Sequence, residues 1–217
     1  AGVRAVCRLM SFRHLGLFPE QLPHWIWMSA QLANANRARA EQRPRVLNLF
    51  AYTGVASLVA AQVGAEVVHV DASKKAIGWA RENQTASDLA DAPIRWIVED
   101  ARKFVAREVR RGRRYDLILV DPPKFGRGTG GETWELFTDL PGLLRDCEKL
   151  LGENGAGLVL TVYAIRASTL AFHQLMKDVL GARGGQFEFG ELAIAPTNGG
   201  WQVPTSLYSR WVGEDGA

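Results

Sequence analysis

The chain has 217 residues, of which 47% are hydrophobic and 23% charged, with a net charge of +3. This length and balance fit one globular domain with a substantial core. No apolar run approaches the ~18 residues that a membrane helix needs, and no signal-peptide pattern is present, so we expect a cytoplasmic protein without a membrane partner. The two cysteines and four histidines lack the spacing of a disulfide framework or a metal site.

Three apolar runs in the first half of the chain are typical of strands. They cover residues 46–51, 66–70 and 94–98, and the second and third lead to Asp71 and Asp100. Segments of helical composition separate them. Strands that alternate with helices build right-handed βαβ units, so the pattern predicts an α/β fold with a parallel sheet.

The turn after the first strand indicates which nucleotide such a sheet would bind. Ala51-Tyr52-Thr53-Gly54 offers one glycine and no lysine, whereas a dinucleotide needs a glycine-rich turn against its pyrophosphate. Asp71 stands where an acid accepts from both hydroxyls of a ribose, and Asp100 is placed to accept from an adenine amino group. An adenosine cofactor without phosphates fits this set, and S-adenosylmethionine is the common one. Taken singly, each acid is more often the N-cap of a helix.

A fourth apolar run, Leu117–Val120, ends in Asp121-Pro122-Pro123. Unbroken Leu, Ile and Val are typical of a parallel strand covered on both faces. Proline fixes φ and carries no N–H, so the pair ends the strand and holds its last carbonyls rigid and unpaired. Ligands of open α/β sheets bind at this edge, so the motif could accept hydrogen bonds from a flat, NH-bearing substrate such as a nucleobase. The alternative is a turn whose Asp121 caps the next element.

The second half of the chain contains elements that would complete the sheet. The glycine-rich residues 126–131 are either a lid that orders on substrate or a disordered connector. The other predicted elements are a helix at 143–151, a strand at 158–161, a helix at 169–180 and two strands at 186–192 and 206–212.

Two groups of basic residues bear on a nucleic-acid partner. One precedes the first strand and consists of Arg37, Arg39, Arg43 and Arg45. The other crowds one helical segment and its exit, and consists of Arg102, Lys103, Arg107, Arg110, Arg111, Arg113 and Arg114. The second group is either an RNA-facing stripe or a solvated helix whose last-turn arginines complement the macrodipole. We slightly favour the solvated helix.

Several motifs together resemble the class I S-adenosylmethionine-dependent methyltransferases, and among them the 23S ribosomal RNA large-subunit enzymes related to the 5-methylcytosine methyltransferase. The motifs lie at residues 47–54, 70–73, 80–83, 99–101 and 121–125. The resemblance implies a Rossmann-like, doubly wound, mostly parallel seven-stranded sheet with a C-terminal antiparallel hairpin, in a domain of residues 45–217. It also implies that residues 1–44 form an N-terminal segment that packs on or near the cofactor site.

The same resemblance assigns roles to individual residues. Gly16–Gln21 resembles the segment that closes over the cofactor in this family, with Phe18 and Gln21 at the methionine end. The residues expected to bind S-adenosylmethionine are Phe18, Gln21, Ala51, Tyr52, Thr53, Gly54, Asp71, Ala72, Ser73, Asn83, Asp100, Ala101 and Asp121. The expected catalytic residues are Asp121, Pro122, Pro123 and Phe125.

The chain departs from the 5-methylcytosine members at one position. Those members use a cysteine after the fifth strand to attack C6 of the base, and residues 158–165 contain none. Cys147 falls within the predicted helix at 143–151, where it reads as a buried core residue, and Cys7 lies near the N-terminus. Covalent C5 methylation is therefore disfavoured.

Direct transfer remains, in which the enzyme mainly aligns the acceptor with the methyl group. Asp121 and the Pro122 carbonyl would accept from an exocyclic amine, and Phe125 or Tyr163 would stack on an extruded base. We expect a methyltransferase that acts on a base of RNA, with ribosomal RNA as the first candidate and no metal. The alternatives are a methyltransferase of a protein or small molecule, and a non-catalytic module that binds the same cofactor.

Overall fold

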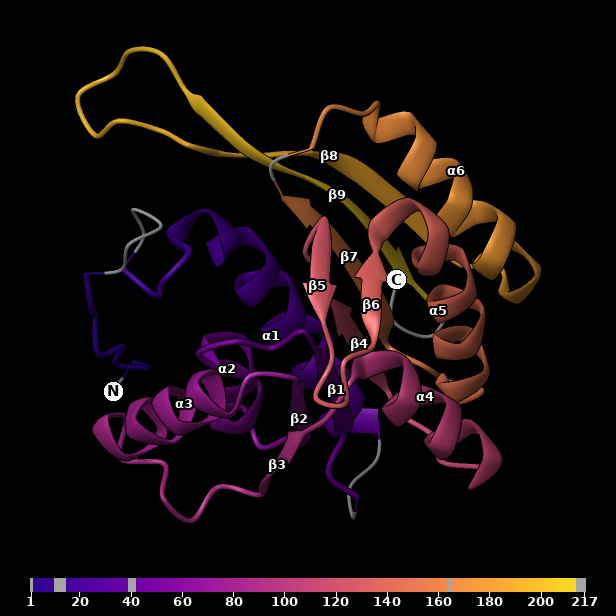
Figure 1. The fold of residues 1–217 in the computed structure, drawn as a ribbon, viewed down its shortest axis with the longest axis horizontal. Coiled ribbons are helices and arrows are strands. Elements are labelled where there is room, and N and C mark those ends of the chain that lie inside the picture. Colours follow the sequence, from indigo (N-terminus) through magenta and orange to yellow (C-terminus); the bar gives the residue numbers. More distant parts are fainter. Residues whose placement is uncertain (1, 10–14, 39–41, 164, 214–217) are drawn as a thin grey trace.

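A computed structural model describes residues 2–9, 15–38, 42–163 and 165–213. Its centre is a seven-stranded sheet with the order β3-β2-β1-β4-β7-β9-β8 (Figure 1). The strands of this sheet are β1 (Arg45–Leu49), β2 (Glu66–Asp71), β3 (Ile94–Val98), β4 (Leu117–Val120), β7 (Gly157–Tyr163), β8 (Gln186–Ile194) and β9 (Val203–Val212).

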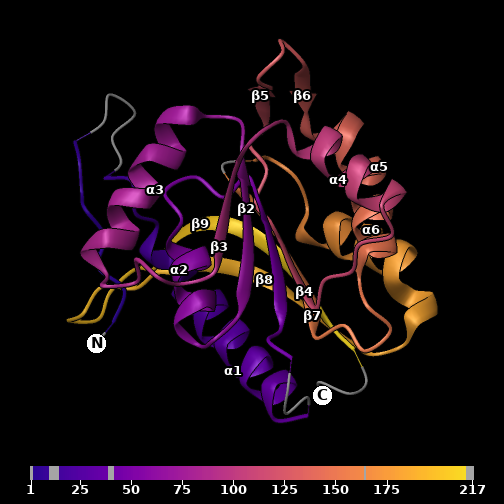
Figure 2. The ribbon, with the colours of Figure 1, turned by 90° about the horizontal axis from the view of Figure 1, so that it is seen from below.

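Helices cover both faces of the sheet (Figure 2). A 3-10 turn, η1, runs directly into α1, which lies with α2 and α3 on one face, while α4, α5 and α6 lie on the other. A second 3-10 turn, η2 (Gly181–Arg183), follows α6. The bounds of the helices are η1 (Pro19–Gln21), α1 (Leu22–Ala38), α2 (Val55–Gln62), α3 (Lys74–Ala86), α4 (Ala101–Arg110), α5 (Leu136–Leu150) and α6 (Thr169–Leu180). None of these described helices is long and apolar enough to cross a membrane.

The strand order confirms the predicted doubly wound sheet. β1 pairs in parallel with both β2 and β4, and β4 pairs in parallel with β7. The order therefore reverses between β1 and β4, which makes their carboxyl ends the switch point where open α/β sheets bind ligands. β9 runs antiparallel to β7 and β8, which confirms the C-terminal antiparallel hairpin.

That hairpin is longer than the sequence indicated. β8 and β9 extend past the body of the molecule as an arm, visible at the upper left of Figure 1. Trp201, in the loop of the arm, is 94% exposed. The base of the arm, by contrast, belongs to the core, where Trp211 is buried against α6 and donates to the Gly184 carbonyl at 2.8 Å.

Residues 126–131 are ordered, which contradicts the disordered connector, and Gly126, Arg127 and Gly128 line the cavity described below. They belong to a small antiparallel hairpin of β5 (Phe125–Arg127) and β6 (Thr133–Glu135). Trp134 fastens this hairpin to the sheet edge: its ring packs 4.9 Å from the ring of Phe50, and its Nε1 donates to the Pro123 carbonyl at 2.6 Å. A single buried aromatic side chain therefore orders a segment whose glycines alone predicted flexibility.

Candidate functional site

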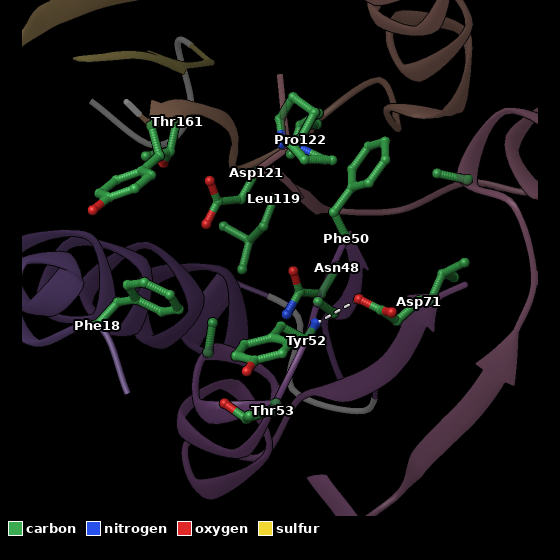
Figure 3. Close-up of a pocket in the computed structure, with 18 of the residues that line it drawn as sticks. Phe18, Asn48, Phe50, Tyr52, Thr53, Asp71, Leu119, Asp121, Pro122 and Thr161 are labelled. Atoms are coloured by element: carbon green, nitrogen blue, oxygen red, sulfur yellow. Dashed lines mark hydrogen bonds between the residues drawn. The ribbon is translucent and has the colours of Figure 1, made fainter. Parts of the chain in front are cut away.

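A cavity of about 510 Å³ lies at the switch point, lined by the ends of β1, β2 and β4 together with η1 and α1 (Figure 3). The structure brings fourteen of the sixteen predicted site residues to its wall; the exceptions are Asn83 and Phe125. The predicted residues that line it are Phe18, Gln21, Ala51, Tyr52, Thr53, Gly54, Asp71, Ala72, Ser73, Asp100, Ala101, Asp121, Pro122 and Pro123.

The turn after β1 is strained, and its backbone amides are already occupied. Phe50 and Tyr52 have φ values of 55° and 47°, in the left-handed region that costs non-glycine residues about 1 kcal/mol each. The Ala51 amide donates to the Val70 carbonyl and the Gly54 amide to the Ala51 carbonyl. These N–H groups are therefore not available to cradle a phosphate, in agreement with the single glycine of the turn.

Gly54 is required for shape. Its φ is 82°, and a Cβ there would lie 2.9 Å from the Cβ of Ala80 on α3. Any other residue would push the turn away from α3. The glycine that resembled a nucleotide motif therefore serves a close approach of backbone to helix, and the turn is held against α3 at this point.

Asp71, at the end of β2, joins the two loops that flank the cavity. Its Oδ2 accepts from the Tyr52 amide at 2.9 Å and its Oδ1 from the Ser73 amide at 2.8 Å, the first of which is drawn in Figure 3. Burial raises the pKa of Asp71 above its ordinary value, and the two amides partly oppose this. Each oxygen keeps a lone pair, so the carboxylate can receive two adjacent hydroxyl groups. Ser73, not Asp71, caps α3.

Asp100 caps α4 and also lines the cavity. Its Oδ1 accepts from the Lys103 amide at 3.1 Å. The β5–β6 turn is pressed against it, since a Cβ on Gly128 would come within 2.9 Å of Oδ2. Phe50 and Trp134 add an aromatic wall to the same cavity, which suits a flat ring.

Asp121, at the end of β4, faces the cavity (Figure 3). Gln21 Nε2 donates to its Oδ2 at 3.1 Å. Burial, together with the nearby Glu20 carboxyl, raises the pKa of Asp121 to about 7. The expectation that the carbonyls after β4 are all unpaired is wrong for Pro123, whose oxygen accepts from Trp134.

Three aromatic rings meet at the cavity wall on the other side of Asp121. The Phe18 ring centroid lies 6.1 Å from that of Tyr52 and 6.1 Å from that of Tyr163. Tyr163, at the end of β7, is half exposed and lines the cavity, as the stacking hypothesis requires of it. Phe18 stands opposite Asp121 in Figure 3.

Two predicted site residues do not reach the cavity. Phe125 is 63% exposed at the start of β5, with Lys124 Nζ 5.3 Å from its ring centroid, because the hairpin turns it outward. Asn83 is buried behind the cofactor turn, where its Nδ2 donates to the Thr53 carbonyl at 2.9 Å and its Oδ1 accepts from the Val6 amide at 2.8 Å. Asn83 therefore supports the turn and does not contact the cavity.

Neither cysteine lies at the cavity, and several basic residues of α4 form ion pairs within the molecule. Cys147 is fully buried in the core on α5, and burial raises the pKa of its thiol, while Cys7 is exposed; neither lines the cavity. On α4, Arg102 pairs with Asp139 at 2.6 Å, Lys103 with Glu132 and Arg107 with Glu99. These internal ion pairs support the solvated-helix interpretation. Arg37 and Arg39 of the other basic group fall where the structure does not describe side chains.

Several polar residues of the wall were not predicted from the sequence: Glu20, His24, Asn48, Arg127 and Thr161. Glu20 and His24 come from the N-terminal segment. Both are buried and lie four positions apart, which places them on one face of the continuous run from η1 into α1. The same face continues with Met28 and Leu32, which are fully buried. This i, i+4 spacing was a readable signal for a helix whose inner face begins with polar residues.

The charge of the wall fits a cationic nucleoside better than a phosphorylated one. Glu20, Asp71, Asp100 and Asp121 contribute carboxyl groups, whereas Arg127 is the one arginine or lysine among the described residues of the wall. Paired hydroxyl acceptors at Asp71, an aromatic wall and an excess of acids suit an adenosine that carries a sulfonium and an ammonium group. S-adenosylmethionine has these features.

Comparisons with known proteins agree with this geometry. A family model described as S-adenosylmethionine-dependent methyltransferase matches residues 23–173. A crystal structure of an S-adenosylmethionine-dependent methyltransferase from Agrobacterium tumefaciens is 54% identical, with a TM-score of 0.91, and the match covers 97% of this chain and 67% of that one.

Curated relatives share shorter regions. The ribosomal RNA large subunit methyltransferase K/L of Shewanella sp. (strain ANA-3) is 38% identical over 114 residues, 51% of this chain and 16% of that protein. The ribosomal RNA large subunit methyltransferase I of Tolumonas auensis is 42% identical over 82 residues, 37% of this chain and 21% of that protein. The matched regions thus cover only 16% and 21% of the length of these two relatives. With its sheet order, its cofactor turn and the matched residues 23–173, the chain belongs to the family of S-adenosylmethionine-dependent methyltransferases.

Proposed function

We propose that this methyltransferase transfers the methyl group directly to an exocyclic amino nitrogen of an RNA base, with ribosomal RNA as the substrate. The observation that carries the proposal is the position of Asp121-Pro122-Pro123, which lines the same cavity as the cofactor turn, while no cysteine lines it. The two curated relatives described above are named as ribosomal RNA large subunit methyltransferases. RNA as a partner rests on that similarity.

The residues of the chain divide the work between cofactor and acceptor. Asp71 would hold the ribose, Asp100 and the Phe50–Trp134 wall the adenine, and the bound cofactor supplies an electrophilic methyl group. Asp121 would accept an N–H of the acceptor, which orients the nitrogen lone pair toward the methyl and stabilises the developing positive charge. Tyr163, half exposed at the wall, is the aromatic side chain available to stack on an extruded base.

A small cationic rim could contact the RNA backbone. Lys124 directly precedes β5 and Arg127 is its last residue; both are exposed, and Arg127 also lines the cavity. Arg166, just after β7, is exposed as well. Arginine and lysine beside an extruded base are typical phosphate contacts, and they predict binding that weakens as salt is raised.

One observation favours a second candidate, a protein or small-molecule acceptor. Much of the basic charge on α4 is neutralised within the molecule by Asp139, Glu132 and Glu99, which leaves a smaller footprint for a polyanion. An uncharged acceptor would bind through the cavity alone and would not need a basic surface around it.

The deciding experiment supplies the purified protein with S-adenosylmethionine labelled in the methyl group. Ribosomal RNA, intact ribosomal subunits, and the protein and small-molecule fractions of an extract are the acceptors. Label that becomes soluble on nuclease treatment, and that mass spectrometry finds on a base amino group, is the expected result. Label in protein or a small molecule, or a C5-methylated pyrimidine, would contradict the proposal. Asp121→Ala should abolish transfer and leave cofactor binding largely intact.

A further inference from the structure

The inner face of the η1–α1 run changes from apolar to polar as it reaches the cavity. Leu32, Met28, His24 and Glu20 follow one another at intervals of four, and all are buried. Leu32 and Met28 pack in the core with β1, β4 and β7. His24 and Glu20 continue the same line into the cavity wall. Two polar side chains thus occupy positions where the pattern of the helix calls for apolar ones.

Glu20 lies beside Asp121 without a partner of its own. It is 7% exposed, and its charge acts on the Asp121 carboxyl. The side-chain amide of the neighbouring Gln21 donates a hydrogen bond to Asp121. No described residue donates a hydrogen bond to the Glu20 side chain. Glu20 lines the cavity, so the donor for its carboxyl has to come from the contents of the cavity. A ligand with an N–H group, bound in the cavity, can supply that donor.

His24 is a second unsatisfied group of the same wall. It is 3% exposed, and neither ring nitrogen has a hydrogen-bond partner among the described residues. The ring packs edge-to-face on Tyr208, with centroids 5.0 Å apart. Burial and the nearby Arg210 lower the pKa of His24 to about 3, so the imidazole is neutral at physiological pH. A neutral imidazole offers one donor and one acceptor.

We propose that Glu20, His24 and Asp121 form the binding site for the acceptor, and that it selects a ring bearing an amino group. In this site Glu20 and Asp121 each accept one N–H of the acceptor, and the imidazole of His24 hydrogen-bonds a heteroatom of the ring. This assignment rests on the proposed function and narrows the class of acceptor. A ribose hydroxyl or a ring carbon cannot hydrogen-bond two carboxyl groups and an imidazole at once, whereas an amino group on a ring can.

The chemical step balances with these groups. The amino nitrogen forms a bond to the methyl carbon as the carbon–sulfur bond breaks, with the electron pair going to sulfur. The nitrogen then releases one proton, which the Asp121 carboxylate accepts. Glu20 keeps the second hydrogen bond and faces the positive charge that develops on nitrogen. Glu20 and Asp121 are thus assigned as acceptor-contacting residues, and His24 as a recognition residue.

The test uses Glu20→Leu, because a ligand-binding and a structural role predict opposite effects on stability. Leucine continues the apolar stripe of Met28 and Leu32, so we expect a higher thermal midpoint than wild type. Calorimetry first sets a saturating concentration of S-adenosylmethionine for each variant, because Glu20 is one of the acids of the wall that the cationic cofactor faces. At saturation we expect kcat/KM for ribosomal RNA to be lowered about 100-fold, through the loss of a hydrogen bond to a charged group. Glu153→Gln, on an exposed turn before β7 at the opposite edge of the sheet, is the control and should match wild type.

A binding readout separates this proposal from the proposed function. Guanosine and inosine differ only in an amino group, as do adenosine and purine riboside, and each is titrated in the presence of the demethylated cofactor product. In wild type, at least one amino-bearing nucleoside should bind about tenfold more tightly than its partner, and Glu20→Leu and His24→Phe should erase the difference. Equal or absent binding in wild type, or a lower thermal midpoint and normal transfer in Glu20→Leu, would overturn the site. If the wild type binds the amino-bearing nucleoside more tightly but does not methylate RNA, only the proposal of an RNA substrate is overturned.

Discussion

Gln21 donates a hydrogen bond of 3.1 Å to Oδ2 of Asp121, across 100 positions of the sequence. The bond joins η1 to the end of β4, so the N-terminal segment and the Asp-Pro-Pro motif form one continuous wall. A donor to a carboxylate favours its ionised form, whereas burial and Glu20 raise the pKa of Asp121 to about 7. These opposing effects leave Asp121 ready to gain or lose a proton near neutral pH.

The first prediction concerns the pH dependence of methyl transfer. Asp121 can accept a proton only when ionised, so kcat/KM should be low at acid pH, rise through about pH 7 and then level off. Gln21→Leu removes a donor to the carboxylate and should move this midpoint upward. Transfer to ribosomal RNA measured from about pH 5 to about pH 9 checks both. A flat profile for the wild type would exclude Asp121 as the proton acceptor.

The second prediction concerns the stability of Asp121→Asn. In the unfolded chain the pKa of the Asp121 carboxyl has its ordinary value of 3.8, and in the folded protein it is about 7, so between these values the native state holds a proton that the unfolded state has lost. The free energy of unfolding of the wild type therefore falls as pH rises from about 4 to about 7. Asparagine does not titrate and still accepts from Gln21.

Asp121→Asn should consequently be more stable than wild type above pH 7, by about 2 kcal/mol after allowance for the partial exposure of the carboxyl. Below about pH 4 the two proteins should be equally stable. Urea denaturation of both proteins, above pH 7 and below about pH 4, measures the difference in their free energies of unfolding. Equal stability of the two proteins at pH 8 would show that the fold does not raise the pKa of the Asp121 carboxyl.

The third prediction concerns Asp71 and the cofactor. Asp71→Ala removes the proposed acceptor for both ribose hydroxyls and also frees the Tyr52 and Ser73 amides, so affinity for S-adenosylmethionine should fall about 100-fold. Asp71→Asn keeps one acceptor oxygen and should lose less. Calorimetric titration gives the affinities, with Asp91→Ala in an exposed loop as the control. Unchanged binding in Asp71→Ala would remove the ribose assignment.

The strands and their terminal acids could be predicted because each depends on a short stretch of sequence. Unbroken apolar runs such as Leu117–Val120 specify buried parallel strands, and parallel strands bring their carboxyl ends to one edge. Asp71, Asp100 and Asp121 therefore converge whatever the details of the loops, as the cavity confirms.

The parts that could not be predicted depend on contacts between distant segments. Glycines at 126–131 suggest flexibility, but Trp134 docks on Phe50 and orders the hairpin. Asn83 is the last residue of the family motif at 80–83, which suggested contact with the cofactor. Its position behind the turn depends on its hydrogen bond with Val6, 77 positions away. The sequence left two interpretations of the basic residues of α4 open, because Asp139, which pairs with Arg102, lies on another helix 37 positions away.

The fourth prediction concerns Cys147. Its thiol is fully buried in the core and does not line the cavity, so Cys147→Ser should lower stability by about 1–3 kcal/mol through the buried hydroxyl and keep full transfer activity. Cys7→Ser, at an exposed position, should change neither property. Thermal melts and the RNA assay measure the two effects. A variant at either position that is folded but inactive would revive a covalent route.

The last prediction tests Asn83 as a positioning residue. Its amide joins the Thr53 carbonyl to the Val6 amide, and Thr53 Oγ1 in turn donates to the Gly16 carbonyl at 2.7 Å, so the N-terminal segment and the cofactor turn brace each other. Asn83→Ala leaves these groups unpaired and should lower stability by about 1–3 kcal/mol.

If Asn83 positions the turn, Asn83→Ala should also weaken binding of S-adenosylmethionine about tenfold and speed amide hydrogen exchange near Thr53, although Asn83 does not line the cavity. The amides of α5 and α6, on the other face of the sheet, should exchange as in wild type because the change is local. Asn198→Ala, in the exposed loop of the β8–β9 arm, is the matched control. A lower thermal midpoint with unchanged cofactor affinity would show that Asn83 stabilises the fold without positioning the turn.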